Sequence, residues 1–244
     1  MQVDALAIRL RPRTAYEAAD LGARLCQSAW RDVYRCYAAV ALPVFALCIA
    51  ASEFSTWLPA VALWWLKPWL DRTILFVLSR AAFGQRTLLS DLWQAQRQVW
   101  WSQLLSTLTW RRLSPWRSFT QPVYQLEGLS FGQTRQRVRQ IRRNRGSTAF
   151  FVTGTYSTCE TCLTLAIFSF LYWFSPLGHA PDFLQFFTGE EGAARTLMYA
   201  VAYAMVLLFL EPFYVAAGFG MYLSRRAELE AWDIEQEFRR AFGS

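Results

Sequence analysis

The sequence has little of two residue types. Among 244 residues there is one lysine, Lys67, and one histidine, His179, and every other basic side chain is arginine. No nucleophile–base pair, glycine-rich phosphate loop or general-acid constellation occurs along the chain. A single histidine in a loop cannot complete a metal site by itself. We therefore expect no catalytic residues, no metal site, no cofactor and no enzymatic activity.

Charged side chains are also scarce. They make up 18% of the chain, against the ~25% usual for a soluble domain, whereas 54% is hydrophobic and 17% aromatic. The length suits one compact domain or a small bundle of spans. The net charge of +7 comes from arginines that lie beside apolar stretches. This placement favours lipid phosphate over nucleic acid as the partner.

The cysteines do not predict a disulfide framework, because all five lie in or near proposed helices. They are Cys26, Cys36, Cys48, Cys159 and Cys162. Cys159 and Cys162 have the spacing of a redox or metal motif, but they lack the strand–helix context or the second ligand pair that such sites need. The first apolar run starts at Tyr37 behind six arginines, so we expect no cleavable signal peptide.

Four apolar stretches predict an all-α, polytopic membrane protein with four firm transmembrane helices. They are Tyr37–Ser52, Phe54–Phe83, Thr148–Phe174 and Leu197–Leu223. The first two are so close that residues 37–83 are expected to form a tight helical hairpin, and residues 148–223 a second one. The first stretch is near the lower limit of roughly 17 residues for a span. All four belong to one helical membrane domain over residues 1–244.

Two amphipathic segments accompany the spans. Residues 14–36 show helical periodicity behind a capping box, in which Thr14 and Glu17 have the required spacing. Residues 88–112 are rich in tryptophan, whose indole ring prefers the membrane–water boundary. An in-plane helix and a tilted, partly inserted helix both fit this second segment.

The remaining segments are polar or basic. Residues 113–132 hold prolines and glycines and predict a connecting loop, and residues 225–242 predict a charged cytoplasmic helix. Residues 133–147 form a basic juxtamembrane segment, which suits topology and anionic lipid head groups at about 1 kcal/mol per residue. Its arginines are Arg135, Arg137, Arg139, Arg142, Arg143 and Arg145. They could also pair with acidic side chains of the terminal helix, namely Glu228, Glu230, Asp233, Glu235 and Glu237.

The distribution of arginine indicates the orientation. Nearly all arginines lie in the amino-terminal region, in residues 84–147 or in the carboxyl-terminal region, and the two other connections hold only Arg195. By the positive-inside rule both termini face the cytoplasm, and we expect a bacterial cytoplasmic (inner) membrane protein. Six spans would satisfy the same rule if both amphipathic segments crossed, but their charges disfavour this.

Charged residues lie at the centres of the spans. Lys67 and Glu211 each precede a proline in the middle of an apolar stretch, and Glu160 lies at a similar depth. A charge at mid-depth costs roughly 2.5–3.5 kcal/mol on insertion scales, so each should find a partner inside the protein. Lys67 has cross-helix candidates in Glu160 and Glu211, which we favour slightly. Its local alternative is Asp71, four residues later on the same face.

A polar stripe runs along the third span. Thr153, Ser157, Glu160 and Thr164 step by four, three and four residues and so share one helix face. Such a row suits a substrate or proton pathway, or hydrogen bonds that hold helices together. We favour the second reading, because small residues at 216–218 and 220 of the fourth span would allow close helix approach.

The second and fourth spans resemble each other. Leu66–Leu70 matches Leu210–Tyr214, and a Leu-Ser-Arg triplet follows about three turns later in each. Both spans would run in the same direction, as in a parallel repeat related by an axis along the membrane normal. The alternative is coincidence, because kinks at proline are common in spanning helices.

Several stretches resemble a known family. They are Leu66-Lys-Pro-Trp-Leu-Asp-Arg72, Val77-Leu-Ser-Arg80, Trp110-Arg-Arg-Leu-Ser-Pro115, Glu211-Pro-Phe-Tyr-Val215 and the run from Leu223 to Asp233. The family is a group of uncharacterised bacterial multi-pass membrane proteins, loosely similar to the membrane region that accompanies some glycerophosphodiester phosphodiesterases. The resemblance implies an all-helical inner-membrane protein with repeated helical units. It implies no catalytic residues, and the hydrolase's acid-rich metal site has no counterpart here.

Three functions remain open. The first, which we favour, is a non-enzymatic scaffold or accessory subunit of a membrane complex, with membrane lipids and other membrane proteins as partners. The second is a small transporter or channel component that uses Lys67, Glu160 and Glu211. The third is a redox use of Cys159 and Cys162 within the membrane. None of these functions involves nucleic acid.

Overall fold

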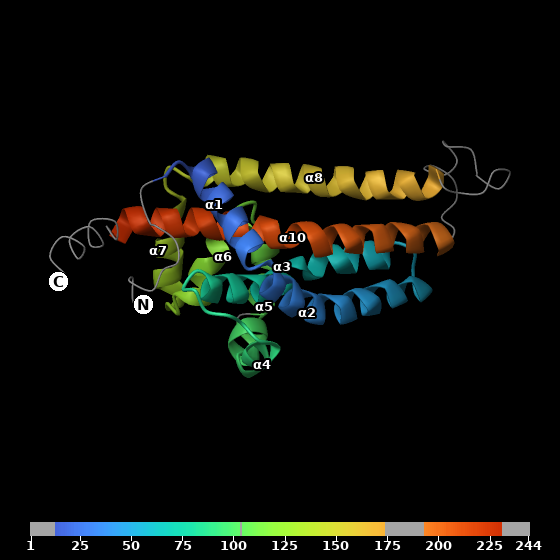
Figure 1. The fold of residues 1–244 in the computed structure, drawn as a ribbon, viewed down its shortest axis with the longest axis horizontal. Helices are drawn as coiled ribbons and strands as arrows, with labels where there is room; N and C mark the ends of the chain where they lie inside the picture. The colour runs from blue at the N-terminus through green and yellow to red at the C-terminus, as the bar shows by residue number, and fades with distance from the viewer. Residues whose placement is uncertain (1–12, 103, 174–192, 231–244) are drawn as a thin grey trace.

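A computed structural model describes residues 13–102, 104–173 and 193–230, and these residues form helices and connecting turns without strands (Figure 1). The expected all-α class is therefore confirmed for this part of the chain. The main helices are α1 (Ala15–Ser28), α2 (Trp30–Ala50), α3 (Leu58–Ala81), α6 (Arg117–Leu126), α7 (Phe131–Arg142), α8 (Gly146–Trp173) and α10 (Ala193–Glu230). The connection between the expected spans Thr148–Phe174 and Leu197–Leu223, which holds His179, lies mostly outside the described residues.

Four long helices run lengthwise, and α10 is the central one (Figure 1). It contacts α1, α2, α3, α6 and α8, whereas α8 packs mainly on α10. The helices α2 and α3 are antiparallel neighbours joined by a 3₁₀ turn at Ala51–Glu53. This agrees with the tight hairpin expected from the sequence. The helices α1, α6 and α7 gather at the end where α10 finishes.

Small residues let α1 and α6 approach the backbone of α10. A Cβ atom added to Gly22 would lie 1.9 Å from the Ala216 carbonyl oxygen, and one added to Gly220 would lie 2.2 Å from the Ala18 carbonyl oxygen. A Cβ on Gly218 would come within 2.4 Å of the Ser118 side chain. The expected close approach at residues 216–220 is confirmed, and α1 and α6 are the helices that make it.

The amphipathic segment 14–36 is not one helix. The capping box forms as predicted, since the Glu17 amide donates to Thr14 Oγ1 at 3.3 Å and the Thr14 amide donates to Glu17 Oε2 at 3.1 Å. The chain then breaks at Ala29, with φ −103° and ψ 18°, and α2 starts at Trp30. One non-helical residue barely disturbs the apolar periodicity, so the break was not visible in the sequence. The first apolar helix is correspondingly longer than Tyr37–Ser52.

Residues 88–112 do not form a continuous amphipathic helix either. They divide into α4 (Leu89–Gln94), a π turn (Arg97–Trp101), α5 (Leu104–Leu108) and a 3₁₀ turn (Trp110–Leu113). Two tertiary hydrogen bonds link this segment to α3. Arg72 Nη2 donates to the Gln98 carbonyl at 3.0 Å, and Trp100 Nε1 donates to Thr73 Oγ1 at 3.0 Å. The segment therefore follows α3.

The region 113–132, predicted as a loop, contains the buried helix α6. Pro122 lies inside this helix without ending it. Most α6 side chains are buried against α10 and α3, including Phe119 and Val123. The proline and glycine content misled the prediction, because burial against α10 outweighs the weak local helix propensity.

The last span and the terminal helix are one element. The helix α10 continues past Pro212 and through the predicted break near Leu223 as far as Glu230. The separate helix predicted at 225–242 is therefore wrong up to residue 230, and its remainder lies outside the described residues.

The helices α7 and α8 meet in a tight turn, in which Asn144 has φ +64°. Asparagine tolerates this left-handed conformation better than most residues.

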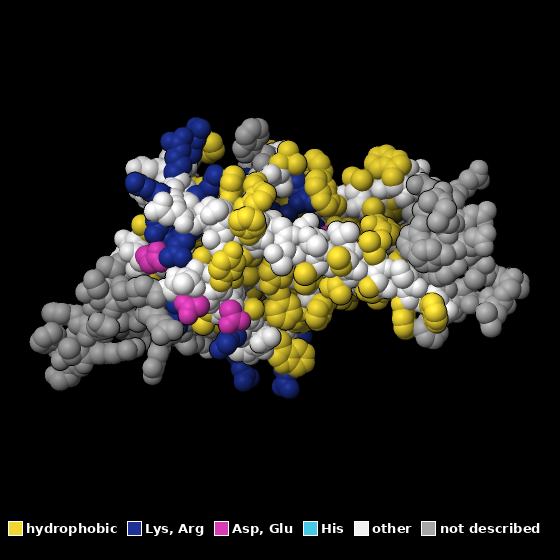
Figure 2. Space-filling model, turned by 90° about the horizontal axis from the view of Figure 1, so that it is seen from above, with side chains coloured by type: hydrophobic (Ala, Val, Ile, Leu, Met, Phe, Trp, Pro, Cys, Tyr) yellow, Lys and Arg dark blue, Asp and Glu magenta, His cyan; other side chains and the backbone are white. Residues whose placement is uncertain are grey.

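Among the described residues, two helical stretches have the length and hydropathy of membrane spans. They are Trp30–Glu53 and Arg195–Glu230, each with a mean hydropathy of 1.8. The all-helical class is confirmed, but the prediction of four firm spans is not confirmed. The helix α3 carries Lys67, Asp71, Arg72 and Arg80, which lower its hydropathy. Figure 2 shows hydrophobic side chains over the middle of one face, with the visible Lys and Arg side chains mainly toward the end that carries α1 and α7.

Candidate functional site

Five charged side chains from four helices meet in the interior. Lys67 Nζ of α3 lies 2.5 Å from Glu160 Oε2 of α8 and 3.0 Å from Glu211 Oε2 of α10. Arg117 of α6 completes the group, because its Nε lies 3.0 Å from Asp71 Oδ2 and its Nη2 donates to Glu211 Oε1 at 3.0 Å. We call these five residues the ion network. Both cross-helix partners expected for Lys67 are present, and Asp71 pairs with Arg117 instead of Lys67.

The charges around the network balance. Arg112 is buried nearby, with its guanidinium 3.6 Å from the centre of the Trp64 ring. Lys67, Arg112 and Arg117 therefore oppose Asp71, Glu160 and Glu211, three against three. Sequence reasoning missed both arginines, because it placed them in a boundary segment and in a loop. The sequence did contain a signal for these arginines, because the single lysine could not neutralise the carboxylates of Asp71, Glu160 and Glu211.

Burial lowers the pKa of both arginines, and nearby groups outweigh this effect only at Arg117. Burial lowers the pKa of Arg112 to about 10. Burial alone also lowers the pKa of Arg117, but Asp71, Tyr214 and Glu211 together outweigh it and raise that pKa above its usual value. Arg117 is thus a fixed positive charge at the centre of the network.

Two cavities lie beside the network, between α3, α8 and α10. One is about 270 Å³ and is lined by Lys67, Arg117 and Glu211 among others, and the second is about 340 Å³. They share Trp64, Ser157 and Glu160. We call the two together the mid-depth groove.

The predicted polar stripe of α8 faces this groove. Thr153 and Ser157 line the first cavity, and Ser157 and Thr164 line the second. Thr153 Oγ1 lies 3.4 Å from the Tyr214 hydroxyl, and Thr164 Oγ1 donates to the Glu160 carbonyl at 2.8 Å. The stripe therefore makes hydrogen-bond contact with α10 and also lines the groove.

The arginine cluster of residues 135–145 divides into two sets. Arg135, Arg139 and Arg143 are exposed. Arg145 contacts Glu228 of α10 at 2.5 Å, and Arg142 lies 3.4 Å above the Trp116 ring.

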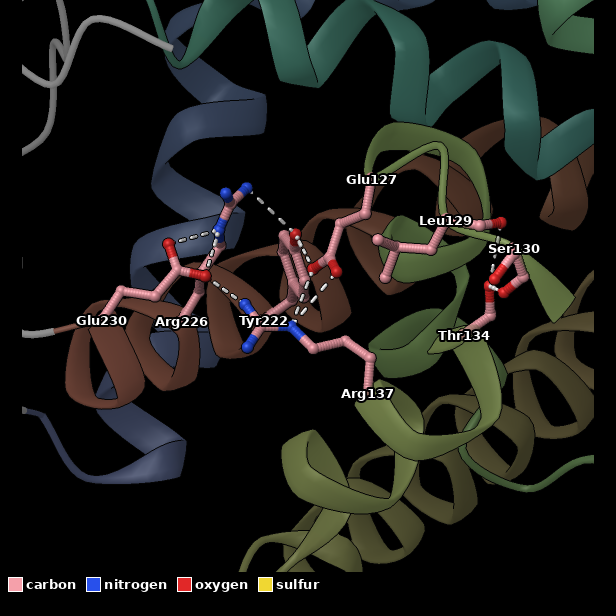
Figure 3. Close-up of polar contacts among 8 residues, drawn as sticks. All are labelled: Glu127, Leu129, Ser130, Thr134, Arg137, Tyr222, Arg226 and Glu230. Atoms are coloured by element: carbon pink, nitrogen blue, oxygen red, sulfur yellow. Dashed lines mark hydrogen bonds and ion pairs between the residues drawn. The ribbon is translucent and has the colours of Figure 1, made fainter. Parts of the chain in front are cut away.

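Arg137 joins α7 to α6 and α10 (Figure 3). It contacts Glu127 at 3.1 Å and also pairs with Glu230. The Tyr222 hydroxyl donates to Glu127 at 2.7 Å, and Arg226 pairs with Glu230 at 3.0 Å. Pairing of the basic cluster with the end of α10 is thus confirmed for Glu228 and Glu230. Asp233, Glu235 and Glu237 lie outside the described residues.

Glu127 is the acceptor that connects α6, α7 and α10, so Glu127→Gln should loosen this end of the bundle. The variant weakens the contact to Arg137 and the hydrogen bond from Tyr222, and we expect the free energy of unfolding to fall by about 1–2 kcal/mol. The measurement is unfolding of the purified protein in mixed detergent micelles. The matched control is Glu53→Gln at an exposed position, which should change little. Equal effects of the two variants would contradict a bridging role for Glu127.

The cysteines and the metal-binding residue types form no visible site. Within residues 13–102, 104–173 and 193–230, no three His, Cys, Asp or Glu side chains are grouped to hold a metal ion. Cys159 and Cys162 are free and exposed on α8. Burial raises the pKa of Cys26 to about 12, which keeps this thiol protonated and unreactive at neutral pH.

The internal similarity has a spatial counterpart. The helices α3 and α10 run in the same direction through the bundle (Figure 1). The two matched positions that precede a proline, Lys67 and Glu211, touch each other at 3.0 Å. The duplication itself stays a prediction, because two parallel helices can meet at kinks of independent origin.

Comparisons with protein-family models, with curated proteins and with solved structures return no match for this chain. The resemblance to multi-pass membrane proteins and to the membrane region of glycerophosphodiester phosphodiesterases therefore stays a prediction from the sequence.

Proposed function

We propose that this chain is a polytopic protein of the bacterial cytoplasmic membrane that works as a non-enzymatic scaffold or accessory subunit of a membrane complex. In this proposal α2, α3, α8 and α10 cross the membrane, with both termini in the cytoplasm. The observation that carries it is the internal pairing of the ion network. Because the buried charges neutralise one another, their first role is to hold four helices in one arrangement.

The exposed surface of α8 supports a partner-binding role. This helix packs mainly on α10 and leaves large apolar side chains exposed, among them Phe151 at 61% and Leu165 at 45% exposure. In a membrane such a surface meets lipid or another helix. A scaffold needs an available helix of this kind.

The scaffold proposal is tested by native electrophoresis after mild extraction with digitonin. We expect the wild-type chain to migrate in an assembly larger than its own detergent-bound monomer. The double variant Phe151→Ala/Leu165→Ala on α8 should release it. The matched variant Leu42→Ala/Leu47→Ala, at exposed positions of α2, should not. Migration of the wild type as a monomer would contradict the proposal.

A small transporter or channel component is the second candidate, and the mid-depth groove favours it. The groove is lined by Lys67, Glu160 and Glu211 and by the polar stripe of α8. Glu160 is the most accessible carboxylate of the ion network, with 15% of its side chain exposed. It is the natural position for a proton or a substrate cation to bind.

Glu160→Gln separates the two candidates. Lys67 keeps Glu211 as a partner, so we expect normal accumulation of the variant. The measurement is proton flux into proteoliposomes, followed with an enclosed pH-sensitive dye. The scaffold proposal predicts no flux above that of empty liposomes in either protein. A flux that the wild type carries and Glu160→Gln loses would favour the transporter.

A further inference from the structure

A third cavity, basic in character, lies on the other side of Arg117. Its volume is about 350 Å³, within the ~300–1,000 Å³ range of ligand pockets. It is enclosed by the second half of α3, the 3₁₀ turn before Ser114, and the helices α6 and α7. It shares Leu113, Ser114, Pro115 and Arg117 with the mid-depth groove. We call it the basic cavity.

The charges that line the basic cavity all have one sign. Its lining includes Arg72, Arg111, Arg117 and Arg142, and none of the described residues that line it is acidic. Arg117 is neutralised by Asp71 and Glu211 of the ion network. Arg111 lies 3.5 Å from the centre of the Tyr124 ring. No acidic side chain in the described lining therefore balances the arginines of this cavity.

Arg72 and Arg142 bring uncompensated charge to this cavity. Arg72 is 4% exposed, and its guanidinium donates to Thr107 Oγ1 and to the Gln98 carbonyl, which are both neutral. Arg142 lies on the Trp116 ring. In the part of the chain that the structure describes, neither guanidinium has a carboxylate within ion-pair distance. A buried cation without a counter-charge is costly, and an anionic ligand would remove that cost.

Gln121 gives an independent indication of a ligand. Its side chain lines the cavity and is 9% exposed, yet neither its amide nitrogen nor its amide oxygen has a hydrogen-bond partner among the described residues. The Nε atoms of Arg72 and Arg142 are also buried without a hydrogen-bond partner in this region. Buried polar groups are nearly always paired in folded proteins. Gln125 Oε1, from another residue of the lining, also has no hydrogen-bond partner among the described residues. Unpaired polar atoms from several residues around one cavity are the pattern expected of a binding site.

The rest of the lining is apolar or aromatic. Pro68, Leu113, Tyr124 and Val138 lie beside the arginines. The cavity is next to α7, whose exposed arginines are Arg135 and Arg139. A ligand that suits this lining carries a compact anion on an apolar body.

We propose that the basic cavity binds the phosphate group of an anionic amphiphile, with Arg72, Arg142 and Gln121 as its ligands. A phosphate oxygen accepts charge-assisted hydrogen bonds from both guanidinium groups and from the Gln121 amide nitrogen. Both a membrane phospholipid and a soluble phosphorylated compound offer this chemistry. The proposal goes beyond the scaffold and transporter functions and does not depend on which of them is right.

The test is native mass spectrometry of the full chain released from dodecyl maltoside micelles. The micelles contain either phosphatidylglycerol or phosphatidylcholine, and inorganic phosphate is added as a competitor in a third series. We expect phosphatidylglycerol to bind about tenfold more tightly than phosphatidylcholine, which a single charge-assisted contact can supply. If millimolar phosphate alone displaces the bound phosphatidylglycerol, the ligand of the cavity is a soluble phosphorylated compound. If phosphatidylglycerol stays bound, the ligand is the lipid.

Two variants with a matched control assign the binding to the cavity. Arg142→Gln should weaken binding about tenfold, whereas Arg24→Gln, at an exposed position of α1 outside the basic segment, should leave it unchanged. Gln121→Leu removes no hydrogen bond that the described residues make, so it should fold at least as well as the wild type and still weaken binding. Equal binding of the two lipids, with no displacement by phosphate, would overturn the proposal. So would equal affinity of Arg142→Gln, Gln121→Leu and Arg24→Gln.

Discussion

Lys67→Met is expected to lower the free energy of unfolding by about 3–5 kcal/mol, because it removes the cation that faces two buried carboxylates. Lys67 Nζ lies 2.5 Å from Glu160 and 3.0 Å from Glu211, and its side chain is only 8% exposed. The loss should appear as a lower protein level in membranes and as earlier unfolding in mixed detergent micelles.

A double variant and a surface control make this prediction specific. Lys67→Met/Glu211→Gln removes one charge of each sign and should recover part of the loss, although Arg117 then keeps only Asp71. Arg24→Met breaks the exposed pair between Arg24 and Asp20 and should cost no more than about 1 kcal/mol. If Lys67→Met and Arg24→Met unfold alike, the ion network does not hold the bundle together.

The second large effect is expected where α1 crosses α10. Gly220→Ala would place a methyl group 2.2 Å from the Ala18 carbonyl oxygen, and backbone on both sides prevents a cheap adjustment. Gly22→Ala would place one 1.9 Å from the Ala216 carbonyl oxygen. We expect each variant to lower the free energy of unfolding by about 3 kcal/mol and to expose α1 to protease.

Gly154→Ala is the matched control for both glycine variants. Gly154 lies in the helix α8, and a Cβ atom there meets nothing within 4 Å. The change should therefore stabilise the protein by about 0.5–1 kcal/mol through helix propensity. Tolerance of alanine at Gly22 and Gly220 to the same degree would show that α1 is not held against α10.

The interior of this protein was largely predictable, because a charge in an apolar helix requires a partner. Lys67, Glu160 and Glu211 were singled out on that ground, and they meet. The partner choice of Asp71 was not predictable from helix spacing, since Arg117 comes from a helix that local signals did not reveal. Local composition indicated a loop at that point, whereas packing against α10 makes α6.

The boundaries of the amphipathic segments were predicted least well. Periodicity runs through the break at Ala29 because a single non-helical residue hardly changes the angle between apolar side chains. In residues 88–112 the tryptophans suggested the membrane boundary, but Trp100 instead hydrogen-bonds to Thr73 of α3. Such tertiary contacts have no signature in the local sequence.

We expect lipid to cover the exposed surface of α8, the helix that carries Glu160 of the ion network. Cys159 and Cys162 are exposed thiols that flank Glu160 on this helix, and they test this expectation directly. The measurement is labelling of inside-out membrane vesicles with a charged, impermeant maleimide, located by peptide mass spectrometry. Arg139→Cys, at an exposed position of α7, serves as the water-accessible reference. We predict that the reference cysteine is modified in intact vesicles, whereas Cys159 and Cys162 react only after denaturation in detergent. Modification of Cys159 and Cys162 in intact vesicles at the rate of the reference would contradict the account.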